Sequence, residues 1–309
     1  MDYEKHHVIG ITSLLRPSLK LDSANPEDHS LFIFRHNSII TFALIYVDDV
    51  ILARSGLLAS RPCSFPMEQN LKLRPDDDSP LVDAFSYRRL IGRLLYLTVT
   101  RPDIVYSVSQ LSQFLTNPRH THLDAAIRVP HYLKQTPGQG IFLSSDNDYT
   151  LKGYCDADWA ECSFTRRSST GYFITLGNSP ISWRTKKQYV VSRSSAEAEY
   201  RAIAVTISEI LWLCWLLQHL IVPQMGPTSL YCDNQAARHI ALSPVFHERT
   251  KYFEIDRFFV RERVTSNEIQ PCSISTANQV ADIFTKALGT NRFQFLRSKL
   301  GIHNLHIPP

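Results

Sequence analysis

Strand-like and helix-like segments alternate from residue 151 to residue 288, and this order constrains the fold more than any other feature of the chain. A long apolar stretch with helical spacing, from about Ser194 to Leu220, opens with Ser194-Ser-Ala-Glu197, the pattern of a helix capping box. The expected elements are strands at 151–158, 170–176 and 180–184, that long helix, strand 229–232, helix 234–242, helix 249–263, strand 268–274 and helix 279–288. Three antiparallel strands followed by alternating helices and strands predict an α/β fold with a mixed five-stranded sheet and flanking helices.

The stretch before this zone, residues 81–146, has helical periodicity. Pro102 suits the first position of a helix, and Pro130 should kink or shorten a third helix at about 120–134. Together with the front of the chain, the sequence therefore predicts three domains, with boundaries at 1–80, 81–146 and 147–309.

Composition is that of an ordinary globular protein of 309 residues with a net charge of +4, which is compatible with a nucleic-acid partner but not specific for one. The six cysteines form no CxxC pair, so we expect reduced thiols in an intracellular protein, cytoplasmic or nuclear. The N-terminus has no apolar signal region, and the longest apolar run, Leu211–Leu217, is too short to span a bilayer. We expect no membrane partner.

Four carboxylates in the α/β zone lie beside apolar strand or helix faces: Asp156, Glu199, Asp233 and Asp282. Two-metal phosphodiester hydrolysis needs several carboxylates that converge from different elements, because Mg2+ prefers oxygen ligands and must keep open positions for water and phosphate. Their positions at strand ends and helix starts predict such a Mg2+-dependent site.

The sequence motifs around these carboxylates resemble the ribonuclease H domain of copia-type retrotransposon polyproteins. They are Gly153-Tyr-Cys-Asp-Ala-Asp-Trp-Ala160, Thr165-Arg-Arg-Ser-Ser-Thr-Gly171, Ser182-Trp-Arg-Thr-Lys-Lys-Gln188, Ser192-Arg-Ser-Ser-Ala-Glu-Ala-Glu-Tyr-Arg-Ala202, Tyr231-Cys-Asp-Asn-Gln-Ala236, His247-Glu-Arg-Thr-Lys251 and Ala281-Asp-Ile-Phe-Thr-Lys-Ala287. The resemblance implies a ribonuclease H-like fold and cleavage of the RNA strand of an RNA–DNA hybrid, with two Mg2+ ions that Mn2+ can replace. It also implies the ligand roles: Asp156 bridges both ions, Glu199 and Asp233 hold the ion at the leaving group, and Asp282 holds the ion that activates water.

Each carboxylate has a rival interpretation. Asp158 lies on the same strand face as Asp156 and is an alternative ligand. Glu197 fits the capping box, which leaves Glu199 for the metal. Asp233 is also placed to cap the next helix, and Asp282 to stabilise the first turn of the last one.

Basic residues flank the expected site. Arg166, Arg167, Lys186 and Lys187 lie on loops or strand ends, where they are candidates for phosphate contacts or for solvated surface charge. One departure from the family is the absence of a histidine shortly before Asp282, where Cys272 and Ser273 stand instead. We expect metal ligation to survive this change and turnover to suffer.

Near the front, two strand-like runs, Ile39–Val47 and Val50–Ala53, predict a β-hairpin with Asp48 and Asp49 at its turn. Tyr46-Val47-Asp48-Asp49 resembles the polymerase hairpin of reverse transcriptases. Three further stretches resemble the copia-type connection to the nuclease: Pro66–Leu73, Tyr87–Arg93 and Thr100–Ile104. The resemblance implies that an upstream palm aspartate and a segment near residue 54 are missing. We therefore expect a truncated palm that cannot synthesise DNA.

Taken together, the sequence predicts a retrotransposon-derived ribonuclease H-type endonuclease attached to a polymerase remnant. Its expected partners are RNA–DNA hybrids and other products of the retroelement polyprotein. The alternative is a catalytically dead relic that binds nucleic acid without turnover.

Overall fold

A computed structural model describes residues 61–143, 148–222, 224–243 and 254–304, and the backbone of three short strands before them. The chain divides into two compact units, residues 1–50 and 51–309, which are described separately.

The first unit contains a three-stranded antiparallel sheet in the order β1 (Asp22–Ser23), β2 (Leu31–His36) and β3 (Ile39–Leu44). The predicted strand that starts at Ile39 is present. It pairs with the strand before it, with Phe34 opposite Thr41. The predicted hairpin turn, including Tyr46, Val47, Asp48 and Asp49, and the run at 50–53 lie outside the described residues.

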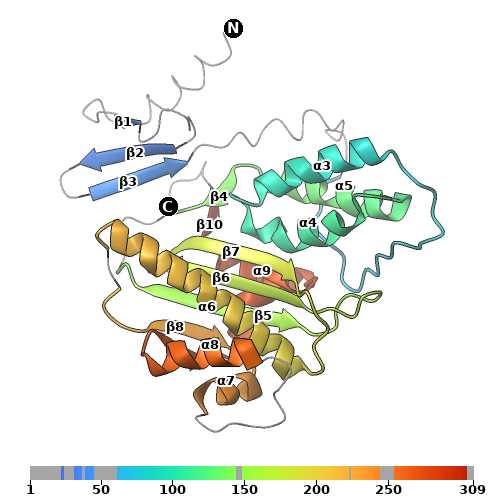
Figure 1. Cartoon of the computed structure of the whole chain (residues 1–309). Coiled ribbons are helices and arrows are strands. Elements are labelled where there is room, and N and C mark those ends of the chain that lie inside the picture. Colours follow the sequence, from blue (N-terminus) through green and yellow to red (C-terminus); the bar gives the residue numbers. More distant parts are fainter. Residues whose placement is uncertain are drawn as a thin grey trace. The chain divides into compact units, whose positions relative to one another are not determined.

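The second unit is built on a mixed five-stranded sheet, so the predicted fold class is confirmed (Figure 1). The central strand β5 pairs antiparallel with β6 and parallel with β8, and the outer pairs are β6 with β7 (antiparallel) and β8 with β9 (parallel). The strands are β5 (Leu151–Asp158), β6 (Ser169–Leu176), β7 (Ser179–Lys187), β8 (Thr228–Cys232) and β9 (Ile269–Ser273), in the sheet order β7-β6-β5-β8-β9. Gly177, with a positive φ of 56°, makes the predicted turn between β6 and β7.

Helix α6 (Ser195–His219) crosses one face of this sheet and packs against β5, α7 (Gln235–Leu242) and α8 (Glu254–Thr265) (Figure 1). It begins as predicted, because the Ser194 hydroxyl accepts the backbone N–H of Glu197 at 3.2 Å. Among the described residues, α6 alone has the length and apolar composition of a membrane-crossing helix, and half of that stretch is buried inside the protein. Packing in the core accounts for the buried half of this apolar stretch, whereas Trp212 and Trp215 are exposed over 52% and 56% of their surface.

One hydrophobic core lies between α6 and the sheet, and a second core is shared by the helical zone and the α/β zone. Tyr87, Ile91 and Leu111 from the helices belong to the same buried cluster as Phe173 of β6 and Phe284. The helices are α3 (Ala84–Leu97), α4 (Val105–Leu111) and α5 (His120–Gln135), with 3-10 turns η1 (Pro102–Ile104) and η2 (Ser112–Phe114). A small two-stranded sheet, β4 (Gln139–Ile141) with β10 (Ile302–Asn304), completes the unit.

A buried ion pair lies at the start of η1 and α4, in the middle of the helical zone. The Arg101 guanidinium donates to the Asp103 carboxylate at 2.7 Å and to the Thr136 hydroxyl at 2.9 Å, and the Tyr132 hydroxyl also donates to Asp103. Both charged side chains are almost fully buried. Arg101 and Asp103, which belong to the copia-like stretch Thr100–Ile104, therefore join α5 to the start of α4 through a buried ion pair.

Helix α5 has nearly the predicted bounds and continues through Pro130 to Gln135, so the proline does not shorten it; Val129, Tyr132 and Leu133 on both sides of the proline are buried. One expectation was wrong. The last predicted helix, 279–288, is instead a short 3-10 helix η5 (Val280–Phe284), followed by α9 (Thr290–Ser298). All five residues of η5 are buried, so this segment has no exposed face with which to form an ordinary amphipathic helix.

Close packing of η5 on β6 depends on the absence of a side chain at Gly171. A Cβ at Gly171 would lie 2.8 Å from Phe284 Cβ and 3.2 Å from the Ala281 carbonyl oxygen. Gly171→Ala should therefore destabilise the protein by about 1–3 kcal/mol in urea unfolding, because η5 must move. The matched control is Gly92→Ala in α3, where an added Cβ meets nothing within 4 Å; it should be neutral or stabilising. Equal effects of the two substitutions would contradict the packing account.

Candidate functional site

The four carboxylates singled out by the sequence come from four different elements that meet at one edge of the sheet. Because Tyr154 pairs with Tyr231 in the parallel β5–β8 ladder, Asp156 and Asp233 follow at the same level of two neighbouring strands. Glu199 lies in the second turn of α6, which packs on β5, and Asp282 lies in η5, which packs on β5 and β6. Sheet register and helix packing thus bring the carboxylates together.

Asp156 and Asp282 share a cationic partner, Lys286. The Lys286 ammonium lies 3.0 Å from Asp156 Oδ2 and 2.8 Å from Asp282 Oδ1. The Thr285 hydroxyl donates to Asp156 Oδ2, and the Arg292 guanidinium lies 3.0 Å from Asp282 Oδ2. This half of the site is an ion-paired network.

Glu199 and Asp233 form the other half of the site, together with Cys232. Their potential ligand atoms all lie within 4.8 Å of one another. The Cys232 thiol lies 3.8 Å from Glu199 Oε2, and the Thr276 hydroxyl donates to Asp233 Oδ2 at 2.9 Å. No cation contacts Glu199 among the described residues, in contrast to Asp156 and Asp282.

Burial and mutual repulsion govern the protonation of these groups. Burial, reinforced by the neighbouring charge of Asp156, raises the pKa of Glu199 to about 11. Burial also raises the pKa of Asp156, although the positive charge of Lys286 opposes the shift. At neutral pH the metal-free site therefore holds a protonated Glu199 beside an ion-paired Asp156.

The contacts separate the carboxylates from their rivals. Glu197 accepts the backbone N–H of Arg193 at 2.9 Å and forms an ion pair with Arg201 at 3.0 Å, so it fastens the start of α6. Asn234, rather than Asp233, caps α7 by accepting the N–H of Ala237 at 2.9 Å.

Asp158, the rival of Asp156, lines a cavity beside the site. Burial, together with the charge of Glu161, raises the pKa of Asp158 to about 6. Asp156 is more enclosed, with 1% of its surface exposed, and it contacts Lys286 directly. The geometry favours Asp156 as the central carboxylate.

The four predicted phosphate-binding residues divide into two groups. Arg166 lines the cavity beside the site, and Arg167 is exposed on the same loop. Lys187 donates to the Cys162 thiol at 2.9 Å, and Lys186 lies over the Tyr189 ring, 4.7 Å from its centroid. Arg166 is thus the best placed of the four for a ligand.

Sequence reasoning missed Lys286, Arg292 and Cys232 as members of the site. Lys286 carried a usable signal, because it follows Asp282 by four residues and the two form an i,i+4 ion pair. Arg292 lies ten positions after Asp282, with a loop between them, so its arrival could not be read from spacing.

Comparisons with known proteins place the chain among retroelement polyproteins. It is 43% identical over 264 residues to the retrovirus-related Pol polyprotein from transposon RE1 of Arabidopsis thaliana, a match that covers 85% of this chain and 18% of that protein. It is 34% identical over 266 residues to the Pol polyprotein from transposon TNT 1-94 of Nicotiana tabacum, over 84% of this chain and 20% of that protein. The chain spans about a fifth of the length of these relatives.

No protein-family model matches the chain. Among solved structures, RNase H1 from the archaeon Halobacterium salinarum aligns with a TM-score of 0.34 and 13% identity, over 44% of this chain and 94% of that one.

Protonation of Glu199 generates a stability prediction. The raised folded-state pKa means that stability is lost as pH rises from the ordinary glutamate range toward about 11, because only the unfolded chain ionises freely. Glu199→Gln removes this penalty and should raise the Tm of the metal-free protein at pH 8 by about 3–8 °C, with the gain fading near pH 4. Glu254→Gln, at the exposed start of α8, should show no such pH-dependent gain in Tm. A pH-independent effect of Glu199→Gln would refute this assignment.

Lys286 generates a second prediction, because it neutralises two buried carboxylates. Lys286→Met should destabilise the metal-free protein by about 1–2 kcal/mol, a buried-pair loss reduced by the partial solvent exposure of Lys286. Saturating Mn2+ should narrow the difference in Tm between Lys286→Met and the parent protein, since it would restore positive charge between Asp156 and Asp282. Lys299→Met is the control, because Lys299 is exposed and donates to the Asn278 side chain. If Mn2+ leaves this difference in Tm unchanged, the metal does not take the position of the Lys286 ammonium, and the prediction is wrong.

Proposed function

We propose that this chain, which belongs to the Pol polyproteins of copia-type retrotransposons, cleaves the RNA strand of RNA–DNA hybrids by metal-assisted hydrolysis. The observation that carries the proposal is the convergence of Asp156, Glu199, Asp233 and Asp282 from four elements on one sheet edge. Because the chain spans 18% of the RE1 relative, the activity of the whole polyprotein is not assigned to it.

The donor set fits a pair of hard divalent cations. Carboxylate oxygens are the ligands that Mg2+ and Mn2+ prefer, and four of them meet here. When bound, such ions supply an activated water and neutralise the leaving oxygen. Asp156 would be shared between the two ions, Glu199 and Asp233 would hold one, and Asp282 would hold the other.

The residues of the chain must rearrange their charges for this role. Glu199 must lose its proton before it can act as a ligand, since its raised pKa keeps it protonated at neutral pH. Lys286 must release at least one of the two carboxylates that it pairs with. A freed Lys286 ammonium and Arg292 would then lie beside a substrate phosphate.

A second candidate function is nucleic-acid binding without turnover. The observation that favours it is the Lys286 ammonium between Asp156 and Asp282, where it satisfies both carboxylates without a metal. Under this alternative the site keeps its internal cation, and the absent histidine near Cys272 and Ser273 fits a protein that does not turn over.

The test is cleavage of a labelled RNA–DNA hybrid by the full chain in Mg2+. We expect cleavage at the RNA strand, and a loss on the order of 10²–10³-fold in Asp156→Asn, because the shared ligand is removed. The matched variant is Asp158→Asn, two residues along the same strand, which should keep most of the rate.

Equal loss in both variants would return Asp158 to the ligand set. Equal activity of Asp156→Asn and the parent chain would sink the site assignment, and binding by the parent without cleavage would establish the second candidate function.

Three further interpretations belong to the proposal. They are the division of the chain at residues 81 and 147 into a palm remnant, a connecting region and a nuclease region, of which the last two lie within the compact unit 51–309, an intracellular location, and the inability of the front segment to synthesise DNA. Tyr46–Asp49 lie outside the described residues, so the last one rests on the sequence resemblance. Primer extension by the purified chain would contradict it.

A further inference from the structure

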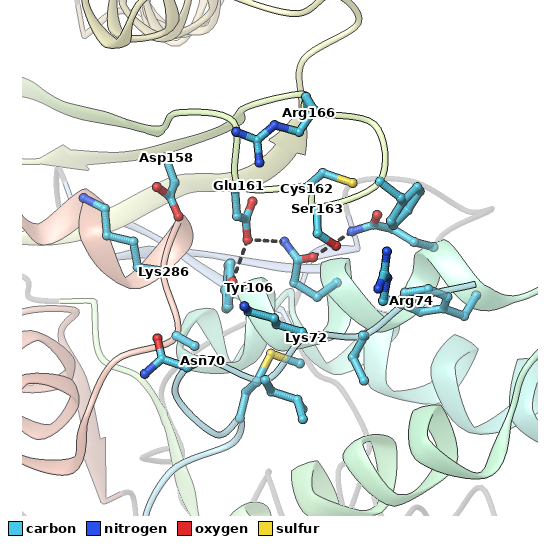
Figure 2. A pocket seen from close by; sticks show the side chains of 18 residues that line it. Asn70, Lys72, Arg74, Tyr106, Asp158, Glu161, Cys162, Ser163, Arg166 and Lys286 are labelled. Carbon is cyan, nitrogen blue, oxygen red and sulfur yellow. Dashed lines mark hydrogen bonds between the residues drawn. The ribbon is translucent and has the colours of Figure 1, made fainter. Parts of the chain in front are cut away.

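A cavity of about 630 Å³ opens beside the carboxylate site (Figure 2). Four parts of the chain line it: segment 67–74, helix α4 with η2, the end of β5 with the loop that follows it to Arg166, and Lys286 with Ala287. Lys286 lines the cavity as well as binding Asp156 and Asp282, so the cavity and the carboxylate site are continuous. We call this cavity the connection groove, because its walls come from both the helical zone and the α/β zone.

The connection groove is held open by contacts between its walls. Glu161, in the loop after β5, accepts the Tyr106 hydroxyl at 2.6 Å and the Gln110 side-chain amide at 2.7 Å, both from α4. Phe164 of the same loop packs near Phe114 of η2, with ring centroids 6.4 Å apart. These contacts fasten the loop to the helices, so the groove is preformed.

Positive charge lies along the exposed rim of the groove. In Figure 2, Arg166 lies above Glu161, and Lys72 and Arg74 lie below it. Within the part of the chain that the structure describes, Lys72 and Arg166 form no ion pair, and Arg74 meets Asp76 at 3.7 Å in an exposed pair of little strength.

Two carboxylates, Asp158 and Glu161, also line the groove, and the positive charge of Lys286 acts on Asp158. Glu161 accepts hydrogen bonds from Tyr106, Gln110 and the Ser169 hydroxyl, so its carboxylate has little capacity left to attract a cation. An anionic ligand would therefore lie along the rim, where Lys72 and Arg166 form no ion pair among the described residues and Arg74 has only its exposed pair with Asp76.

Apolar surface accompanies these charges. Phe164 and Leu71 line the groove and are exposed over 42% and 40% of their surface. The Lys187 ammonium lies 4.8 Å from the centroid of the Phe164 ring, and the ring stays partly exposed. A rim of cations with a partly exposed aromatic ring suits a polymer that carries both phosphates and bases, since the exposed part of the ring can contact a base and the cations can pair with the backbone. An acidic peptide would use the charges but not the ring.

We infer that the connection groove binds the sugar–phosphate backbone of one nucleic-acid strand next to the carboxylate site, through Lys72, Arg74 and Arg166. The inference rests on the proposed function for the identity of the substrate. Its consequence is that segment 67–74 and α4, which precede the α/β zone, form part of the substrate-binding surface.

The test is binding of a fluorescent RNA–DNA hybrid to the full chain without divalent metal, measured by anisotropy over a range of salt concentrations. Removing three phosphate contacts with Lys72→Gln, Arg74→Gln and Arg166→Gln together should weaken binding about 10–100-fold and reduce the salt slope by about 2–3. The control carries Arg89→Gln, Arg93→Gln and Lys152→Gln, which remove the same charge from residues outside the groove. It should stay within about threefold of the parent, because only non-contacting charge is lost.

Thermal unfolding of both triple variants checks the fold, and all three groove side chains are exposed. Equal weakening by the groove and control variants would overturn the inference, as would a parent chain that does not bind the hybrid. Competition by polyglutamate as effective as competition by unlabelled hybrid would also overturn it, in favour of an acidic protein ligand.

Cleavage in Mg2+ separates this inference from the proposed function. A parent that binds through the groove but does not cleave would keep the inference and remove the proposed function. A groove variant that binds and cleaves like the parent would remove the inference and keep the function.

Discussion

Mutual repulsion among buried carboxylates is the constraint on which this site depends. Asp156, Glu199 and Asp282 are each no more than 6% exposed, so water cannot screen their charges. The chain meets the repulsion in two ways: Lys286 and Arg292 pair with Asp156 and Asp282, and Glu199 keeps its proton because its pKa is raised to about 11. A divalent cation would change both the ion pairs and the protonation, because it would replace the Lys286 ammonium and favour the ionised form of Glu199. The metal-free fold and the proposed chemistry therefore depend on the same charges.

Placement of these charges follows from the packing of a few backbone segments. The parallel β5–β8 ladder sets Asp156 beside Asp233, and the close approach of η5 to Gly171 sets Asp282 and Lys286 opposite them. The helical zone shares a hydrophobic core with η5 and β6, so it helps to hold in place the segment that carries Asp282. The same zone forms one wall of the connection groove. Nuclease-like and connecting parts of residues 51–309 thus act as one structural unit.

The sequence predicted the sheet well because its signals are local. The strand patterns, the Gly177 turn and the Ser194 cap each determine the structure of residues close to them in the sequence. The strands β5 and β6 and the helix α6 therefore begin and end near the expected positions. Prediction failed where tertiary contacts decide. Residues 279–288 were predicted as a helix, but only 280–284 form a short 3-10 helix, which is fully buried and packs against Gly171. Family resemblance found the four carboxylates, whereas Arg292 and the groove residues Lys72 and Arg74 reach their places only through the fold.

The most direct test of the central claim is the count of protons released when Mn2+ binds. Isothermal titration calorimetry of the full chain at pH 7, in two buffers of different ionisation enthalpy, measures this number. If Glu199 is protonated in the metal-free site and becomes a ligand, binding should release about one proton, and Glu199→Gln should abolish the release. Mn2+ binding without proton release, or release unchanged in Glu199→Gln, would contradict the account.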